Sequence, residues 1–434
     1  MSVRVQAICY LLLLVASRGS VAQEWTRFRG PNGSGVSHAT TIPTTWTDAD
    51  YRWKAQLPGV GHSSPVIWGE KVFLLSADPS DATRYVLCYS TEDGSLLWRR
   101  DFESVSHHLH PRSSYASSTP AVDAGQVYVV WSTPKKVTFK AFTHQGTESW
   151  SVDLGPWVGR HGFGNSPIVY GDQVILHLSQ QADKIEPGEV PGESCMLALD
   201  CATGCEVWRT PLVSRQVSYS VPLIYTPPAG DPELVCTSTG DGVFSLDPET
   251  GSKNWSIDAF DQRTVGSPIL AGGLILGSNG SGAYSGNYLV AVRPGKHPEI
   301  VYTIKNSSRV KAPYVPSAIA GGDAVFLIYD RGFASCIDAS TGEIHWMERT
   351  GGKFNGSPIR VRDKIFAIDE EGLVWVIAAD KAELKILAKN DLGEPSHSTP
   401  AVAGGKMFLR TYSQLFCVGG ISAEAPTIRT GKKP

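Results

Sequence analysis

The chain has 434 residues, of which 41% are hydrophobic and 19% charged, so it has enough apolar side chain to bury a core and is not wholly disordered. Its formal net charge of −3 at pH 7 gives no reason to expect nucleic acid or an anionic membrane surface as a partner. The 44 glycines and 28 prolines fall at turns between short apolar runs, and no long amphipathic helix is evident.

Residues 1–22 have the pattern of a signal peptide. Arg4 precedes an apolar run over residues 5–16, and small residues end the segment at Ser20 and Ala22. We therefore expect cleavage after Ala22 and export to the periplasm or the medium. The apolar run is too short for a membrane span. Cys9 lies inside the run rather than after it, so the lipid-attachment cysteine of a lipoprotein is missing.

Residues 51–420 repeat one unit. Each copy opens with small residues around a proline, continues with two β-branched strands, and ends in a tight turn and an outer strand. The turn is clearest from Asp338 to Trp346, where the Asp carboxylate can accept backbone N–H groups and Gly342 can take a positive φ. The opening prolines lie 42 to 55 residues apart, the spacing of four-stranded propeller blades: Pro65, Pro120, Pro167, Pro222, Pro268, Pro316, Pro358 and Pro400.

Nearly every outer strand carries an aromatic residue, which we expect to pack between blades rather than against a ligand. The eighth copy stops after residues 415–418 and lacks an outer strand, but residues 51–57 can supply it. Trp53 lies 12 residues before Pro65, as Trp346 lies 12 before Pro358. The sequence therefore predicts an all-β, eight-bladed β-propeller of four-stranded blades, with its last blade closed by an N-terminal strand. Residues 23–50 form an N-terminal extension, and residues 421–434 a polar tail.

The phrase from Leu197 to Trp208, with its copies at Asp247 and Asp338, resembles the pyrroloquinoline-quinone-like repeat. That repeat is shared by quinoprotein alcohol dehydrogenases and by the outer-membrane assembly lipoprotein BamB. The resemblance implies blade architecture over nearly all of the mature chain. The enzymes of this family carry a pair of adjacent cysteines over the quinone and bind calcium with acidic and amide side chains. This sequence has no such cysteine pair, so we expect no quinone cofactor.

Seven cysteines remain after cleavage, so at least one is unpaired. Cys88, Cys336 and Cys417 occupy the repeat position of Ala198, where we expect a small, buried side chain and hence free thiols. Cys201 and Cys205 flank a hairpin turn and are the candidate pair for a disulfide.

Loop length varies between the second and third strands and between blades, and in a propeller these loops share the face that holds the channel mouth. Binding sites tend to lie on such loops. The longest connections between blades are residues 98–120 and 150–167. The candidate binding residues on this face are His62, His108, His110, Arg112, Tyr115, Arg160, His161, Arg263, Lys311, Lys353 and His397.

Three interpretations of these residues stay open. Neutral imidazoles could bind a transition metal, with His108, His110 and His161 as the candidate ligands. The Arg, Lys, His and aromatic groups could instead bind an anionic or sugar-like ligand, or a loop of a partner protein. Or they could simply line a solvated channel mouth.

Of the possible functions, we favour a monomeric, exported, non-catalytic propeller that binds a protein partner or an envelope or saccharide ligand on the variable-loop face. The alternative is a quinoprotein-like oxidoreductase or a metal-dependent enzyme with its site at the channel mouth.

Overall fold

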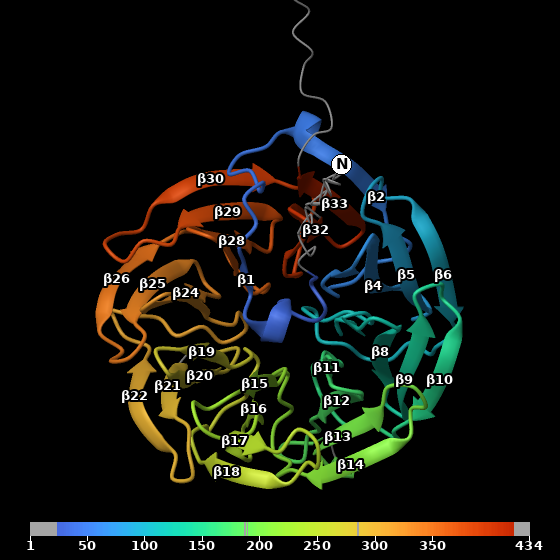
Figure 1. The fold of residues 1–434 in the computed structure, drawn as a ribbon, viewed down its shortest axis with the longest axis horizontal. Helices are drawn as coiled ribbons and strands as arrows, with labels where there is room; N and C mark the ends of the chain where they lie inside the picture. The colour runs from blue at the N-terminus through green and yellow to red at the C-terminus, as the bar shows by residue number, and fades with distance from the viewer. Residues whose placement is uncertain (1–23, 186–187, 189, 284–285, 421–434) are drawn as a thin grey trace, which may run out of the picture.

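The computed structural model describes residues 24–185, 188, 190–283 and 286–420. The predicted signal peptide and the predicted polar tail lie outside these residues. Eight antiparallel sheets stand around a central axis and form a ring (Figure 1). In blades 1 to 7 the strands follow one another in chain order from the axis to the rim. The predicted eight-bladed propeller is confirmed.

The blades have the following strands. Blades 1 to 4 consist of β3 (Val66–Trp68), β4 (Lys71–Ala77), β5 (Arg84–Ser90) and β6 (Leu96–Phe102); β7 (Ala121–Val122), β8 (Gln126–Thr133), β9 (Lys136–Thr143) and β10 (Glu148–Asp153); β11 (Ile168–Tyr170), β12 (Gln173–Leu178), β13 (Cys195–Asp200) and β14 (Glu206–Pro211); and β15 (Leu223–Tyr225), β16 (Glu233–Ser238), β17 (Gly242–Leu246) and β18 (Lys253–Ile257). Blades 5 to 7 consist of β19 (Ile269–Ala271), β20 (Leu274–Asn279), β21 (Tyr288–Arg293) and β22 (Glu299–Lys305); β23 (Ile319–Gly321), β24 (Ala324–Tyr329), β25 (Phe333–Asp338) and β26 (Ile344–Arg349); and β27 (Ile359–Val361), β28 (Lys364–Ile368), β29 (Leu373–Ala378) and β30 (Ile386–Asp391).

Blade 8 joins the two ends of the described chain. Its inner strands are β31 (Ala401–Ala403), β32 (Lys406–Arg410) and β33 (Gln414–Gly419), and its outer strand is β2 (Tyr51–Gln56). β2 pairs antiparallel to β33, with Trp53 opposite Cys417. The predicted closure by an N-terminal strand is therefore confirmed.

The repeated turn has the geometry expected from its residues. Asp338 Oδ1 accepts the backbone N–H groups of Ser340 and Thr341, each at 2.9 Å, and Gly342 has a φ of 74°. A bulge between Cys336 and Ile337 then breaks the alternation of the outer strand. Because of this bulge, the buried indole of Trp346 lies directly opposite Cys336.

The outer-strand aromatics pack between blades, as predicted. Trp53 of blade 8 donates its indole N–H to the carbonyl of Thr91 in the blade 1 turn at 3.1 Å, and its ring covers Gly94 of that turn. A Cβ atom on Gly94 would lie 2.5 Å from this ring. Trp98 makes the same kind of contact with the blade 2 turn, through the carbonyl of His144. The same contact thus joins consecutive blades and also closes the ring between blades 8 and 1.

One opening proline was assigned to the wrong position. β23 begins at Ile319 as β3 begins at Val66, so the residue of blade 6 that corresponds to Pro65 is Ala318. Pro316 lies two residues earlier, in the loop that leads to the blade. A proline is not required here, because what the repeat needs is a small residue at the start of the innermost strand.

The seven cysteines of the described residues are all free thiols. Cys88, Cys336 and Cys417 are fully buried, as predicted, and burial raises the pKa of each thiol to about 12. The structure does not join Cys201 to Cys205. Cys201 is buried beside Tyr128 of blade 2, whereas Cys205 is exposed on the other side of the turn, so the two side chains face different surroundings.

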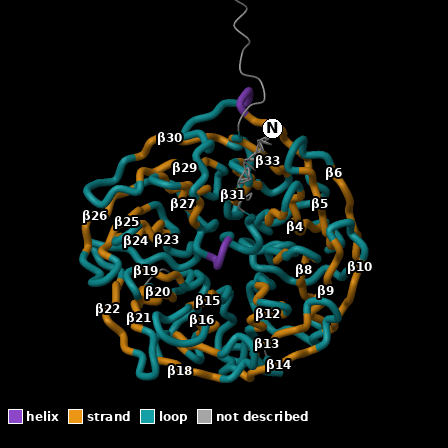
Figure 2. Tube along the Cα trace, viewed as in Figure 1, coloured by secondary structure: helices purple, strands orange, loops and turns teal. Residues whose placement is uncertain are grey.

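Residues 24–37, which we call the N-terminal plug, cross one end of the central channel. They include the short 3₁₀ helix η1 (Pro31–Gly33), which lies at the axis of the ring (Figure 2), and the strand β1 (Val36–Ser37). β1 adds a parallel fifth strand to blade 7 by pairing with β27. A second 3₁₀ helix, η2 (Asp48–Asp50), leads into β2 at the rim.

The N-terminal plug contacts blades on opposite sides of the ring. Trp25 exchanges backbone hydrogen bonds with Ile67 of blade 1, at 3.1 and 2.9 Å. The side chain of Asn32 bonds the backbone of Ile224 in blade 4 in both directions, each at 2.7 Å. Arg29 Nη2 donates to the carbonyl of Ala318 in blade 6 at 2.7 Å. The plug therefore closes the channel from one side, a feature that the repeat pattern did not predict.

Candidate functional site

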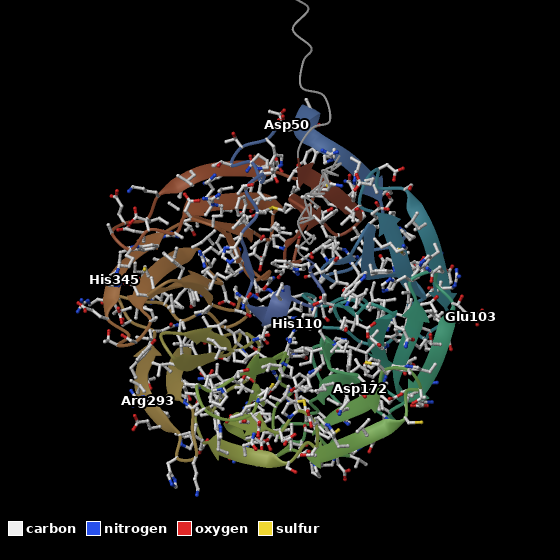
Figure 3. All side chains as sticks on the ribbon, in the orientation of Figure 1. Asp50, Glu103, His110, Asp172, Arg293 and His345 are labelled. Carbon is white, nitrogen blue, oxygen red and sulfur yellow. The ribbon has the colours of Figure 1, made fainter. Side chains whose placement is uncertain are left out.

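A cavity of about 270 Å³ lies at the centre of the ring, between the N-terminal plug and the variable-loop face. We call it the funnel. Phe28 of the plug forms part of its floor, and loops from between the blades form its walls. His110, from the long loop between blades 1 and 2, lies near the axis of the ring (Figure 3). Loops from between several blades thus contribute to the wall of one cavity.

A circle of hydroxyl groups forms part of the funnel wall. Its members precede the innermost strand of each blade, and we call them the hydroxyl belt: Ser64, Thr119, Ser166, Ser267, Ser317, Ser357 and Thr399, with Val221 in blade 4. The backbone N–H of one member donates to the hydroxyl oxygen of the next, from Ser64 to Thr119 at 3.0 Å and from Thr119 to Ser166 at 2.9 Å. The link from Thr399 back to Ser64, at 3.0 Å, continues the belt across the seam between blades 8 and 1.

The hydroxyl belt has one gap. Val221 has no hydroxyl group, so the backbone N–H of Ser166 cannot make the corresponding bond in blade 4. The N–H of Val221 itself still donates to Ser267 at 3.0 Å, and the remaining links continue around the ring. Each linked hydroxyl accepts one backbone N–H. Ser357 donates its own proton to Ser317 and Ser166 to the Gly164 carbonyl, and a hydroxyl without such a partner can donate its proton to a ligand.

Two histidines meet at the seam of the ring. The ring centroids of His62 and His397 are 4.6 Å apart, and Tyr412 packs edge-on against His397. Burial lowers the pKa of His62 well below its usual value, and His397 and Arg410 lower it further. Burial also lowers the pKa of His397. Both rings are therefore neutral at pH 7.

A second histidine pair lies across the mouth. His110 and His161 have ring centroids 4.8 Å apart. Burial lowers the pKa of His161 to about 4, and Arg263 contributes to this shift. Burial and Arg112 lower the pKa of His110. The funnel is thus lined by four neutral imidazoles, two from each side of the mouth.

Arg112 connects the loop between blades 1 and 2 to blade 7. Its Nη2 atom lies 3.6 Å from Glu370 Oε1, which also accepts a hydrogen bond from Asn355 Nδ2 at 2.9 Å. Arg112 and Asn355 both line the funnel, whereas Glu370 does not. The long loop therefore reaches over the mouth and is held on its far side.

The structure brings together five of the eleven predicted site residues in the funnel: His62, His110, Arg112, His161 and His397. His108 and Arg160 instead line a separate, wider groove of about 1330 Å³ beside blades 2 and 3. A turn follows His110, in which the N–H of Ser113 bonds the His110 carbonyl at 2.8 Å. His108 and His110 line different cavities.

The other four predicted site residues have structural roles or lie outside both cavities. Tyr115 bonds the backbone of His107 and lies under the guanidinium of Arg84, 4.7 Å from its ring centroid. Arg263 is buried and donates to the carbonyl of Val217 at 3.1 Å. Lys311 and Lys353 line neither cavity.

The predicted metal ligands do not converge. Among the described residues, no three His, Cys, Asp or Glu side chains come close enough to hold a metal ion together. His110 and His161 are adjacent, but His108 is in the other groove. A calcium-bound quinone also lacks matching residues here. Calcium takes carboxylate and amide oxygens, and the funnel lining offers the amide of Asn355 but no carboxylate.

Sequence reasoning missed several funnel residues. Tyr219 and the hydroxyl belt come from loops that looked like ordinary repeat starts, and Phe28 comes from the extension that has no copy elsewhere in the chain. The Ser-Pro or Thr-Pro pair at six of the eight blade starts was the signal for the belt. No comparable signal marks Phe28.

The sequence model of outer membrane protein assembly factor BamB matches residues 46–282 and 305–385 of this chain. The chain belongs to this family. The match covers blades from the closing strand to blade 7 and agrees with the resemblance inferred from the repeat. The chain matches no curated protein sequence.

Solved structures share the architecture of this BamB-family propeller at low sequence identity. BamB from Moraxella catarrhalis is 15% identical, with a TM-score of 0.56 over 86% of this chain and 99% of that one. A europium-containing methanol dehydrogenase is 11% identical, with a TM-score of 0.65 over 92% and 98%. Quinohemoprotein alcohol dehydrogenase from Comamonas testosteroni is 12% identical, with a TM-score of 0.60 over 93% and 82%. At such identities the likeness shows the fold alone.

The BamB-family propeller has no membrane-spanning helix in its described part, where no helix is long and apolar enough for the purpose.

Proposed function

We propose that this protein is exported and acts as a non-catalytic propeller that binds a protein partner or an envelope ligand on its variable-loop face. The funnel is the central contact site. One observation carries this proposal: in the described part of the chain, the plug crosses one end of the channel, so that the funnel lies between the plug and the variable loops. A pre-formed, partly apolar cavity with a few convergent polar groups is the usual form of a binding site.

Export is supported by the amino-terminal pattern of a signal peptide ending at Ala22. The propeller family supports a binding role, since the chain matches the BamB sequence model over most of its length. An oxidoreductase is the weaker candidate. The family's enzymes need adjacent cysteines and a calcium set, and the funnel residues offer neither.

The test compares matched variants on envelope material. The mature protein is immobilised and incubated with a detergent-solubilised envelope fraction from the producing cells. A triple variant, His110→Ala, Arg112→Ala and His161→Ala, removes three polar side chains at the mouth. His345→Ala, on the exposed outer strand of blade 6, is the matched control (Figure 3).

We expect the wild type and the control to retain the same component, and the triple variant to lose at least about nine-tenths of it, since hydrogen bonds to charged groups contribute on the order of 1.5–3 kcal/mol. Equal retention by all three proteins would show that the funnel is not the contact site. Fractionation tests export separately. The mature protein should be recovered outside the cytoplasm with Gln23 as its first residue.

A further inference from the structure

The described residues of the funnel wall carry positive and hydrogen-bond-donating groups but no carboxylate. Within the described ranges, the lining contains Arg112, four histidines, belt hydroxyls and no Asp or Glu. This is unusual in a chain with more acidic than basic residues, 42 against 39. The electrostatic potential in the funnel is therefore set by Arg112 and by charges behind the wall.

Two of those charges lie below the floor. Arg27 and Arg29 of the plug are 6% and 0% exposed. Arg27 donates to the carbonyl of Pro222, and Arg29 to the carbonyl of Ala318, residues that directly follow the funnel-lining Val221 and Ser317. Each guanidinium group thus bonds the backbone at the residue that follows a position of the hydroxyl belt.

Neither floor guanidinium has a carboxylate partner among the described residues, because all the hydrogen bonds described for them go to backbone carbonyls. Arg29 Nε and Nη1 have no hydrogen-bond partner in this part of the chain. Burial lowers the pKa of each group to about 9, so both remain charged at pH 7. A buried cation without a counter-ion is costly unless an anion compensates it.

The carboxylates behind the wall are already occupied. Glu370 accepts hydrogen bonds or ion-pair contacts from Asn355 and Arg112. Asp330 is buried behind the wall and accepts the backbone N–H groups of Tyr314 and Val315, at 2.7 and 2.9 Å. Both carboxylates are thus bonded to groups of the protein itself, and neither lines the funnel.

We propose that the funnel is an oxyanion site, which binds the carboxylate or phosphate group of a small ligand. The inference rests on the proposed function, in which the funnel is the contact site, and it adds the chemistry of what enters. Arg112 and the imidazole N–H groups provide donors at the mouth, and the belt hydroxyls provide donors at the wall. The two buried guanidinium groups add a positive field from below, and the volume of about 270 Å³ suits an anionic group on a few carbon atoms.

The experiment uses inorganic phosphate and citrate as probes of the two anion types, with sodium chloride at equal ionic strength as the reference and glycerol as a neutral probe. Calorimetric titration and the melting temperature are measured for the wild type at pH 7. Arg112→Gln removes the guanidinium charge at the mouth and, separately, His110→Leu removes an imidazole N–H donor. Arg293→Gln is the matched control, because Arg293 also pairs with a glutamate but on the outer side of blade 5.

We expect saturable binding of phosphate, citrate or both, with a rise in melting temperature that chloride and glycerol do not produce. Arg112→Gln and His110→Leu should each weaken this binding about tenfold, the loss expected from one charge-assisted hydrogen bond, while Arg293→Gln leaves it unchanged. Binding of phosphate alone assigns a phosphate group, and binding of citrate alone a carboxylate.

The proposal is overturned if neither anion binds, or if Arg293→Gln weakens binding as much as Arg112→Gln does. Its failure is distinguishable from that of the proposed function. If the triple variant fails to retain the envelope component but the wild type binds no anion, the funnel remains the contact site and takes a ligand without an oxyanion.

Discussion

The titration of His177 should be visible in the stability of the protein. It lies in β12, is fully buried, and bonds the carbonyl of Ser220 in the next blade through Nδ1 at 3.2 Å. Burial lowers its pKa to about 4. In the unfolded chain the pKa is about 6.5. Between these two values the unfolded chain binds a proton that the folded protein does not, so stability falls as pH decreases from 6.5 to 4.

The substitution His177→Asn replaces the imidazole with an amide that does not titrate. The amide can still donate a hydrogen bond to the carbonyl of Ser220. We expect the loss in unfolding free energy between pH 7 and pH 4 to become smaller by about 3 kcal/mol, the product of the pKa difference and 1.4 kcal/mol per unit. Chemical denaturation at several pH values measures it. His345→Asn, at an exposed site, should leave the pH dependence unchanged. If the unfolding free energy of His177→Asn fell between pH 7 and pH 4 as much as that of the wild type, His177 would not be the source of this pH dependence.

At the level of single residues, the sequence predicted which residue types lie at the mouth better than it predicted where each side chain lies. Imidazoles from blades 8, 1 and 2 were expected at the mouth, and four of them are there. Their pairing was not predictable, because it depends on the path of a loop without regular structure, along which His108 and His110 line separate cavities. The roles of Arg263 and Tyr115 were also hidden, because burial of a polar side chain is decided by neighbours that are distant in sequence.

The contact between an outer-strand indole and the turn glycine of the next blade is the element that joins the ring. At Gly94, alanine would meet the ring of Trp53 and would also sit at a φ of 70°. Gly69 has a φ of 55° but nothing within 4 Å of an added Cβ, so it isolates the cost of the backbone conformation. The pair therefore separates backbone strain from inter-blade packing.

We expect Gly69→Ala to cost about 1–2 kcal/mol of unfolding free energy, from the left-handed conformation alone. Gly94→Ala should cost a further 1–3 kcal/mol or so, because the indole must move. Melting temperatures of the two variants measure the difference. Equal losses would mean that Trp53 moves away at no cost, and that the ring is closed mainly by the pairing of β2 with β33.

The elements that repeat were predictable, and the element that does not repeat was not. Eight copies of one repeating unit were enough to assign the blades, their order and the strand that closes the ring. The N-terminal plug has no copy, and its contacts join residues as far apart as Arg27 and Pro222. A pattern search has nothing to compare such a segment with. The floor of the candidate site therefore became visible only in three dimensions.

For the whole molecule, two truncations distinguish the plug from the closing strand. A variant that lacks residues 24–37 keeps β2 and should remain a folded monomer, with a lower melting temperature because it loses the buried Trp25, whose indole alone contributes about 3–5 kcal/mol. A variant that lacks residues 24–56 loses β2 as well. It exposes the edge of β33, and we expect it to associate or aggregate.

Size-exclusion chromatography with light scattering measures both outcomes, and thermal melting provides the stability of the shorter truncation. If both variants stay monomeric, the ring does not depend on β2 for closure. If both aggregate, the plug is needed for the ring to form and not only to close the channel.

The course of the plug also fixes the order in which the protein can be completed. Residues 24–56 are among the first to be made, yet the strands they join, β27 and β33, are among the last. Each blade can form as it emerges, because it contacts mainly its neighbours. Trp25 can contact blade 1 early, but the strands β1 and β2 have no pairing partners until the chain has been made almost to its end. Folding of the ring is therefore completed when its first strands pair with its last.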